Sequence, residues 1–511
     1  MIFENIILPI DYTEEDMRQA VLKAAHKKNP KKKLVIRKIR LLRRSIDARK
    51  KPELFYVCRI AVNEEIPELV IPRADENLQV TVCGTGPAGL FAALVLTEAG
   101  AKVTLLERGK PVEERIRDTE RFFETGELNE ESNVQFGEGG AGTFSDGKLN
   151  TLIKDKKNYG SFVLKTFYEA GAQEAILVDA KPHIGTDVLV KVIKNLREKL
   201  VNQGAEFRFS SRLEDIAADS EGRLFGITVN GQSLPCERLV LACGHSARDT
   251  YQMLYDRGVH LEQKPFAVGI RIEHPQEMIT LSQYGTLDYE ELGAAPYKVT
   301  YQASNGRGVY SFCMCPGGYV VNASSEKGHL AVNGMSYAAR DSRNANSGIV
   351  VQIRTSDYED EHPLAGMVFQ RELEKRAYEK ADGDIPVQTW KDFSEGIETT
   401  DAPVKPEMRG KYRFSDLHGI FPAEIEEALK EAIPAFGKRI RGFDRDDCLL
   451  SAVESRTSSP VRILRDETYQ TNLRGIYPAG EGAGYAGGIM SAAIDGMETA
   501  FQILEEYLTH G

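Results

Sequence analysis

The sequence predicts an α/β protein: a doubly wound, Rossmann-like domain that is interrupted by a β-rich insertion and preceded by a small α+β domain. Residues 80–107 read as strand, glycine turn, helix and strand, with the pattern G-x-G-x-x-G. Strands and helices alternate until about residue 265, where β-rich segments begin. The chain ends in a short strand, a glycine loop and a helix. The resulting domain boundaries are 1–76, 77–265 with 456–511, and 266–455.

The first domain is predicted from its short periodic segments. We expect strands at Phe3–Pro9, Leu34–Leu42 and Leu54–Val62 and an amphipathic helix at Glu14–Lys28. Alternation along the second strand places Val35 on the covered face of the sheet and most Lys and Arg side chains on the exposed face.

This domain is strongly basic although the whole chain is acidic. Between Lys27 and Lys51 there are thirteen Lys or Arg residues, Lys32 among them, against one acid, Asp47, which gives +12 in a chain of net charge −11. Such a stretch is typical of a surface for RNA or another polyanion. It is also typical of a solvated face, and the absence of interleaved aromatic residues favours that interpretation.

The glycine turn that follows has the residues needed to hold a dinucleotide. Gly84 permits the tight turn after the strand, Gly86 lets the backbone approach a pyrophosphate, and Gly89 lets the helix pack on the sheet. Pro87 suits the first helical turn, whose free N–H groups face the phosphates. Glu107, at the end of the second strand, is expected to accept a hydrogen bond from a ribose hydroxyl. The glycine pattern alone is weak evidence, but here the strand, the helix and the acid occur in register.

A second glycine-rich segment, FGEGGAGTFSDGKLN at residues 136–150, follows a predicted helix at Val112–Thr125. Five glycines in so short a span exclude a helix or a central strand, because each would cost roughly 1 kcal/mol of backbone entropy there. A loop of this kind lets main-chain N–H groups approach a ligand. No convincing strand leads into it, so we reject it as a second nucleotide fingerprint.

The middle of the chain supplies further elements. We expect a strand in EFRFSSRLEDI, a helix at Thr186–Gln203 capped by Thr186, a hairpin turn at Asn230-Gly231, and a buried strand at Leu239–Cys243 that ends on Gly244.

Residues 266–455 are β-rich, with predicted helices at Leu364–Ala381 and Ala423–Glu431. An insertion of this kind usually covers a cofactor and shapes the substrate site, so we interpret it as the substrate domain. A strand at Leu473–Ala479 then leads into a glycine loop and a helix from about Ile489. No second strand follows, so this is not a complete nucleotide-binding unit.

The composition, 41% hydrophobic and 28% charged residues among 511, is that of an ordinary soluble protein. No apolar run approaches the roughly 18 residues of a membrane span, and the amino terminus lacks the basic flank of a secretory signal, so we expect a cytoplasmic protein with no membrane partner. The seven cysteines show no disulfide-framework spacing and are predicted to be reduced. Cys313 and Cys315 form the one close pair, so no metal site is predicted.

Together these segments favour FAD over NAD. Bound NAD requires fewer segments than this chain offers. The chain has a complete fingerprint near its start, a buried strand ending at Cys243-Gly244, and a glycine loop with a helix at its end. They resemble the FAD-binding domain of glutathione-reductase-type flavoproteins, in which a terminal G-D motif contacts the ribityl chain and pyrophosphate and the next helix points at the flavin. Here Glu481 replaces that aspartate.

The resemblance narrows with the segments FGEGGAGTFSDGKLN, FCMCPGGYVVNASSE, VNGMSYAARDSRNAN, ESRTSSPVRI and PAGEGAGYAGGI. They look like the bacterial FAD-dependent dehydrogenases called NAD(FAD)-utilizing dehydrogenases, over essentially the whole chain. This resemblance implies FAD and leaves the reaction open. The predicted cofactor-binding residues are Gly84, Gly86, Pro87, Ala88, Gly89, Glu107, Arg108, Gly139, Gly140, Gly142, Thr143, Lys148, Cys243, Gly244, Gly480, Glu481, Gly487, Gly488 and Ile489.

Candidate catalytic residues are fewer. Lys148 could place a positive charge beside the flavin, although a surface lysine fits the pattern equally well. Cys313 and Cys315 are either a redox pair that exchanges electrons with the flavin or small core residues on one face of a strand. The predicted catalytic set is Arg271, His274, Lys148, Cys313 and Cys315, and His183, His245 and Arg456 also lie in loops or at strand ends that could face the cleft.

Two functions remain open. The first is an FAD-dependent oxidoreductase, a dehydrogenase that passes a hydride between a donor and an unidentified small-molecule substrate. Because the sequence contains no second complete nucleotide fold, NAD(P)H as donor would bind transiently over the flavin. The second is an RNA-associated flavoprotein that uses the basic N-terminal domain, with a modifying or non-catalytic role. The three-part cofactor framework favours the first.

Overall fold

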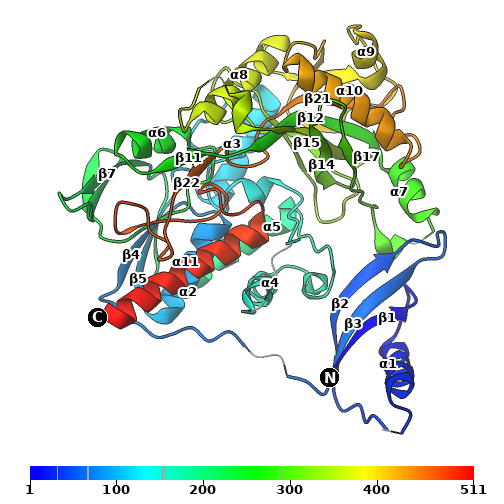
Figure 1. The fold of residues 1–511 in the computed structure, drawn as a ribbon, viewed down its shortest axis with the longest axis horizontal. Helices are drawn as coiled ribbons and strands as arrows, with labels where there is room; N and C mark the ends of the chain where they lie inside the picture. Colours follow the sequence, from blue (N-terminus) through cyan, green and yellow to red (C-terminus); the bar gives the residue numbers. More distant parts are fainter. Residues whose placement is uncertain are drawn as a thin grey trace.

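A computed structural model describes residues 1–31, 33–65, 68–151, 155, 157–288, 290–358 and 360–510 of the protein. Figure 1 shows a small N-terminal domain beside a parallel-sheet domain, onto which the C-terminal helix packs, and a β-rich domain that covers one end of that sheet. In the described ranges, no helix combines the length and the apolar character needed to cross a membrane.

The N-terminal domain is an antiparallel sheet with one helix. Its elements are β1 Ile2–Leu8, α1 Glu14–Lys28, β2 Ile39–Asp47 and β3 Phe55–Val62, and the sheet order is β1-β3-β2. The predicted helix is confirmed, but the second strand, predicted at Leu34–Leu42, begins and ends five residues later, at Ile39–Asp47. Pairing with β3 starts where Ile39 faces Val62, so the residues before Ile39 lie outside the sheet and Val35 is 62% exposed. Lys32 falls outside the described residues.

In the described chain, five parallel strands form the sheet that carries the glycine turn. They are β4 Gln79–Cys83, β5 Lys102–Leu106, β6 Glu206–Arg208, β10 Leu239–Leu241 and β23 Ile476–Pro478, in the order β23-β10-β4-β5-β6. Successive residues of a strand point to opposite faces. Val80 and Val82 therefore enter the core under the helices, whereas Cys83 enters the core on the other face.

The two faces of this sheet are covered differently. Helices α2 Pro87–Ala99 and α11 Ile489–His510 pack on one face, where α4 Tyr159–Glu169 and α5 Thr186–Asn202 join the same core. The other face is covered by an antiparallel sheet of β7 Leu213–Ala218, β8 Leu224–Val229 and β9 Gln232–Pro235, together with α6 Arg248–Asp256. The prediction of a doubly wound sheet is corrected accordingly, because a hairpin-based sheet replaces most of the second helical layer. The remaining short elements here are α3 Val112–Thr125, η1 Ala141–Phe144 and η2 Glu174–Leu177.

Three local predictions can be judged in this region. The segment EFRFSSRLEDI forms two strands in separate sheets, β6 and β7, because Ser210 between them has a left-handed backbone with φ of 50°. The hairpin turn is confirmed, with positive φ at both Asn230 and Gly231. Thr186 does not cap α5: Gly185 occupies the cap, and the Thr186 hydroxyl donates to the Ser145 carbonyl at 2.9 Å.

The inserted domain is built on a mixed sheet of order β13-β14-β17-β12-β21-β18-β20. Its strands are β12 Phe266–Pro275, β13 Thr300–Gln302, β14 Gly308–Cys315, β17 Asn344–Ile353, β18 Ile385–Thr389, β20 Tyr412–Phe414 and β21 Leu449–Glu454. A smaller sheet contains β15 Tyr319–Asn322, β16 Val332–Met335 and β19 Met408–Arg409, and β11 Leu261–Gln263 pairs with β22 Val461–Ile463. The helices are α7 Gln276–Tyr284, η3 Glu290–Leu292, η4 Thr355–Asp357, α8 Ala365–Lys380, α9 Trp390–Glu395 and α10 Ala423–Gly437.

Buried ion pairs join the inserted domain to the parallel-sheet domain. Glu374 of α8 is fully buried and binds Arg248 of α6 at 2.9 Å and Arg456 at 3.0 Å. These two guanidinium groups lower the pKa of Glu374 although burial alone would raise it. The N-terminal domain is attached through Arg44, whose side chain binds Asp179 at 2.6 Å.

The packing of α2 on the glycine turn gives a stability prediction. A Cβ at Gly89 would lie 1.9 Å from the Gly84 carbonyl oxygen, whereas the nearest atom to a Cβ at Gly86 would be the Gly140 Cα at 3.8 Å. We expect Gly89→Ala to lower the free energy of unfolding of the flavin-free protein by about 1–3 kcal/mol, because the backbone must move to remove the overlap. Gly86→Ala serves as the control and should leave that free energy within error in urea denaturation. Equal stability of the two variants would contradict this packing.

Candidate functional site

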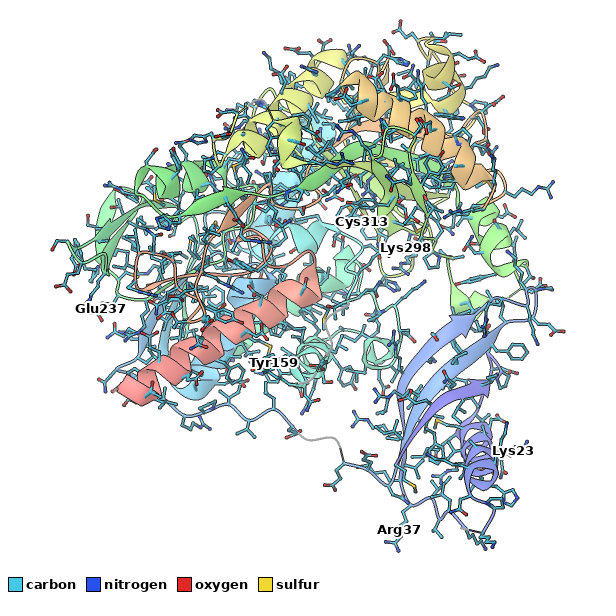
Figure 2. The ribbon with its side chains drawn as sticks, viewed as in Figure 1. Lys23, Arg37, Tyr159, Glu237, Lys298 and Cys313 are labelled. Atoms are coloured by element: carbon cyan, nitrogen blue, oxygen red, sulfur yellow. The ribbon has the colours of Figure 1, made fainter. Side chains whose placement is uncertain are left out.

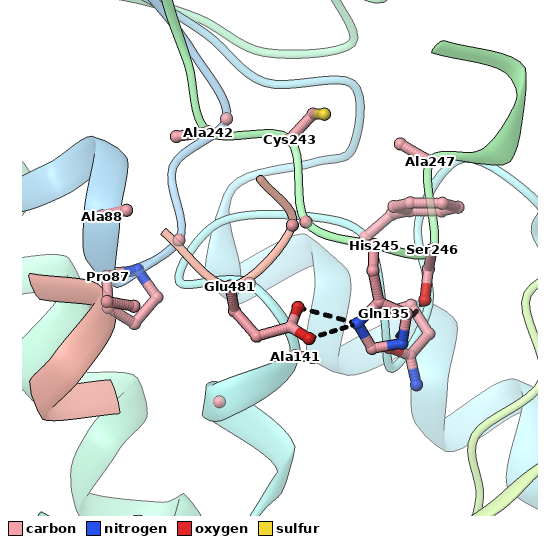
Figure 3. A pocket seen from close by; sticks show the side chains of 18 of the residues that line it. Pro87, Ala88, Gln135, Ala141, Ala242, Cys243, His245, Ser246, Ala247 and Glu481 are labelled. Carbon is pink, nitrogen blue, oxygen red and sulfur yellow. Dashed lines mark hydrogen bonds and ion pairs between the residues drawn. The ribbon is translucent and has the colours of Figure 1, made fainter. Parts of the chain in front are cut away.

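A cavity of about 410 Å³ lies where the glycine segments meet the inserted domain. Its walls contain the first glycine turn, the second glycine loop, the end of β10, the terminal glycine loop and part of β14. Segments far apart in the sequence thus share one cavity, as the close view in Figure 3 illustrates for the residues around Pro87, His245 and Glu481.

Backbone atoms form much of this wall. Gly84 has φ of +101°, and a Cβ there would lie 2.3 Å from the Ala242 carbonyl oxygen, so the turn requires glycine. No side chain caps the N-terminus of α2 at Gly86, which leaves its first N–H groups free at the cavity. Gly488 and Ile489, at the start of α11, also line the cavity. Two long helices therefore begin at the site, an arrangement that favours anionic groups.

Glu107 ties the first two glycine segments together. One carboxylate oxygen accepts from the Thr85 N–H and hydroxyl at 3.0 and 2.7 Å, and the other accepts from the N–H groups of Gly109 and Gly137 at 2.9 and 3.1 Å. A carboxylate has about four acceptor positions, so donors of the described chain fill this one. Glu107 lines the cavity, but its contacts do not support the predicted role of a free acceptor for ribose.

Arg115 holds the same glycine loop through its carbonyl groups. The side chain is fully buried in α3 and donates to the carbonyl oxygens of residues 133, 134, 137, 138 and 140 at 2.7 to 3.2 Å. No sequence pattern marks this residue, because a basic residue in a charged helix is expected to be exposed. Its signal is spatial: a loop without secondary structure needs an internal donor for each buried carbonyl.

Two arginine side chains, each paired with acidic residues, lie at the end of the cavity near β5. Arg108 lies over the Phe136 ring at 4.0 Å and binds Glu131 and Asp249, each at 2.9 Å. Arg212 also lines this end and binds Glu131 at 3.1 Å. Arg212 was not among the predicted residues.

The terminal loop is held by a contact that sequence reasoning missed. Glu481 binds His245 Nδ1 at 2.7 and 2.8 Å (Figure 3). It also accepts from the Ser459 N–H at 2.8 Å. Burial would raise the pKa of Glu481, but the neighbouring His245 lowers it below its ordinary value. His245 Nε2 is buried on the cavity wall without a hydrogen-bond partner among the described residues.

The opposite end of the cavity lies against the inserted domain. Lys148 binds Asp146 at 2.9 Å, and Arg340 binds the same carboxylate at 2.5 and 2.9 Å. Asp146 raises the pKa of Lys148 although burial opposes this, and the two cations in turn lower the pKa of Asp146. Lys148 is therefore a charged group on the cavity wall at neutral pH.

Cys313 closes this end from β14 and lies toward the middle of the molecule (Figure 2). Arg271, fully buried in β12, donates to the Cys313 carbonyl at 3.2 Å and forms a two-point ion pair with Glu454 at 2.6 and 2.9 Å. Arg271 also reaches Asn333, another lining residue, at 3.3 Å. Arg271 thus lies behind the wall and supports it.

Most of the predicted site residues line the cavity, and a minority do not. Of the cofactor set, four residues do not line the cavity: Gly89 packs on the Gly84 carbonyl, Gly139 and Thr143 pack on one another, and Gly480 packs on Ala88. All the others line it. Of the catalytic set, Lys148 and Cys313 line it, whereas Arg271, Cys315 and His274 do not.

His274 is the clearest departure from the predicted catalytic set. The side chain is fully buried, its Nε2 lies 2.7 Å from the Phe443 carbonyl oxygen, and its ring packs on that of Phe443 at 4.5 Å. Burial lowers its pKa to about 4. His274 follows the alternation of β12 into the core instead of toward the cavity.

Comparisons with known proteins agree with the cofactor that this cavity suggests. Residues 77–119 match the family described as an FAD binding domain, residues 265–457 match FAD-dependent protein, C-terminal domain-like, and residues 1–63 match a domain of unknown function. An uncharacterized protein of Clostridium beijerinckii is 45% identical over 98% of each chain. The chain belongs to the family of this clostridial protein, and two of its segments match FAD-dependent family domains.

Two of the solved structures that match the chain are more distant in sequence. Quinol fumarate reductase of E. coli is 13% identical, with 85% of this chain and 71% of that chain covered and a TM-score of 0.39. Glycerol-3-phosphate dehydrogenase of Bacillus halodurans complexed with FAD is 12% identical, with 84% and 65% covered and a TM-score of 0.38.

The predicted cofactor, FAD, is confirmed, and the residues present fit it. The cavity has a volume typical of ligand sites, about 300–1,000 Å³, and its close backbone approach at Gly86 and Gly140 leaves room that a Cβ would fill. The helix starts at Gly86 and Ile489 provide N–H groups for anionic parts of a dinucleotide. The dehydrogenase subfamily inferred from the sequence remains a prediction.

Arg115 yields a prediction about cofactor retention. Arg115→Met should remove one donor from each of five carbonyl groups, of which those of Asn133 and Val134 have no other donor among the described residues, at a cost of about 3 kcal/mol or more. We expect the purified variant to carry less flavin per chain, measured by absorbance, and to unfold at lower denaturant. Arg117→Met, an exposed position on the same helix, is the matched control. Wild-type flavin content in Arg115→Met would show that the loop holds its shape without this side chain.

Proposed function

We propose that this protein is an FAD-dependent oxidoreductase that transfers a hydride between a donor and a small-molecule substrate at the cavity end lined by Lys148, Phe312 and Cys313. The observation that carries the proposal is the continuity of the cavity. It runs from the glycine turn at Gly86 to Cys313 of the inserted domain, so FAD and a substrate could lie in it side by side.

When bound, FAD supplies two-electron chemistry, and the protein supplies position and charge. Lys148 places a positive charge at the reacting end, where it would stabilise negative charge that develops during reduction. Asp146 holds Lys148 in place, and Arg340 in turn binds Asp146. Phe312 forms an apolar part of the wall, which favours an environment with little water.

The proposal also names the electron donor. We infer a dissociable nicotinamide donor, because the described ranges contain one parallel sheet with a glycine turn and no second one. The alternative of an RNA-associated flavoprotein receives no support from the comparisons. The basic side chains between Lys27 and Lys51 that the structure describes are exposed, apart from Arg44, as a solvated face requires.

Anaerobic mixing tests this function directly. The flavin-containing protein is mixed with NADH, with NADPH and with a panel of reduced metabolites, and the absorbance of oxidised flavin is followed. The proposal expects loss of that absorbance with at least one donor and its return when an electron-accepting substrate is added. Unchanged absorbance with every donor would overturn it.

Lys148 gives a quantitative prediction for the same assay. Removing a charged donor from a reacting centre typically costs about 10²-fold or more in rate, so Lys148→Met should slow flavin reduction by at least about tenfold while flavin content is retained. Folding should survive, because Arg340 still neutralises Asp146. Lys181→Met, at an exposed position, is the control. A wild-type reduction rate in Lys148→Met would remove Lys148 from the proposed chemistry.

A further inference from the structure

Cys313 and Cys315 lie at an irregularity in β14. Phe312 pairs with Gly348 and Cys315 pairs with Asn346, so three steps along β14 face two along β17. Such a bulge bends the strand, and Cys313 accordingly has a left-handed backbone with φ of 42°. Alternate Cα atoms of a regular strand are about 6.6–6.8 Å apart, which is the outer limit of disulfide geometry. A bend at this position shortens that separation.

The two thiols are adjacent but differ in exposure. Cys313 lines the cavity, whereas Cys315 is fully buried behind it. The Cys315 thiol donates to the Cys313 carbonyl oxygen at 3.2 Å, and Lys148 Nζ lies 4.0 Å from the Cys315 sulfur. Cys313, which lines the cavity, can therefore meet a ligand, and the Cys315 thiol contacts the Cys313 backbone from behind the wall.

The charged groups around the pair favour a thiolate at Cys313. The contact with the Cys315 thiol, followed by the positive charges of Lys148 and Arg271, lowers the pKa of Cys313 below its ordinary value, against the opposing effects of burial and Asp146. Glu454, which also faces Cys313, has its own charge paired with Arg271. A thiolate is the form that attacks a disulfide.

Cys243 offers an internal comparison. It also lines the cavity, toward the end near Arg108, but burial raises its pKa to about 12. Cys83 lines the cavity beside Cys243, and burial raises its pKa well above the ordinary value as well. Cys58, Cys236 and Cys448 are buried and do not line it. Among the described cysteines that line the cavity, Cys313 is therefore distinguished by its place at the end near Lys148 and by its lowered pKa.

We propose that Cys313 and Cys315 form a redox-active dithiol pair and that the substrate class of this protein is a disulfide. The proposal rests on the oxidoreductase function proposed above and names its substrate class. It adds a protein-based electron carrier between the flavin and the substrate.

The chemistry balances in two exchanges. The Cys313 thiolate attacks a substrate disulfide, one substrate thiol leaves, and Cys315 then attacks the mixed disulfide, so that a second substrate thiol leaves and an S–S bond joins Cys313 to Cys315. FAD, when bound and reduced, would supply the two electrons and two protons that break that bond and restore both thiols, and a nicotinamide donor would in turn supply two electrons to the cofactor.

An anaerobic reductive titration of the oxidised holoenzyme with dithionite tests the carrier. Wild-type protein should accept four electrons per flavin, two for the flavin and two for the disulfide, whereas Cys313→Ser and Cys315→Ser should each accept two. Cys236→Ser, a buried position whose thiol donates to the Arg238 carbonyl, is the control and should accept four. Two electrons in the wild type, or four in either serine variant of the pair, would overturn the proposal.

A second measurement does not depend on the flavin. Trypsin releases both cysteines in one peptide, residues 308–327, which contains no other cysteine. The proposal expects this peptide to be two hydrogen masses lighter after oxidation, and to react twice with iodoacetamide after reduction. An unchanged mass and two alkylated thiols in fully oxidised protein would contradict it, whatever the catalytic activity.

The substrate class is tested by trapping. Reduced protein is treated with Ellman's disulfide as the probe, and the mass of the tryptic peptide 308–327 is measured by mass spectrometry. Cys315→Ser should retain the probe as a mixed disulfide on Cys313, whereas the wild type should lose it and contain the internal disulfide. A mixed disulfide that persists in the wild type would exclude Cys315 as its partner. If donors reduce the flavin but both cysteine variants match the wild type, only the dithiol proposal fails; if no donor reduces the flavin, the oxidoreductase function fails instead.

Discussion

The cavity depends on hydrogen bonds that satisfy the backbone N–H and C=O groups of a buried loop with almost no secondary structure. Residues 136–142 must be rich in glycine to approach a cofactor, and this leaves buried N–H and C=O groups that no helix or strand satisfies. Two buried side chains do so in complementary ways. Glu107 accepts from N–H groups at Thr85, Gly109 and Gly137, whereas Arg115 donates to five carbonyl groups. A carboxylate and a guanidinium group thus replace the hydrogen bonds of regular structure.

The same solution recurs at the other end of the cavity. The bulge at Cys313 is irregular backbone, and Arg271 reaches its carbonyl while the charge of Arg271 is paired with Glu454. The fit is close, since a Cβ at Gly334 would lie 2.0 Å from the Arg271 guanidinium. A buried charge is costly unless it is paired, so each such group restricts what its neighbours can be. Both ends of the cavity therefore combine irregular backbone with a buried charged side chain that fixes it.

Local signals in the sequence predicted the framework of this protein well. The helix at Glu14–Lys28 and the turn at Asn230-Gly231 were predicted correctly, because caps and periodicity act within a few residues. The second strand was predicted too early, at Leu34–Leu42, because β2 starts where its partner β3 begins to pair with it, at Ile39, and the pattern around Val35 does not encode that partner. The residues of the site were predicted with the same success for local patterns and the same failure for long-range contacts. Glycine patterns located the cavity walls, whereas Arg115 was missed and His274 was misassigned, because their roles depend on contacts across the fold.

Glu481 replaces the aspartate of the terminal motif that this chain resembles, and it makes different contacts. Where the glutathione-reductase-type pattern has aspartate, the longer side chain here reaches His245 and the Ser459 N–H, so it locks the terminal loop to the end of β10. The adjoining contact is tight, since a Cβ at Gly482 would lie 2.6 Å from the Gly244 backbone. A nearby aspartate, Asp495, instead accepts from the Gly480 N–H at 2.7 Å. The acid of the motif therefore serves the joint between two cofactor-binding segments, and the polar atom that this joint leaves facing the cavity is His245 Nε2.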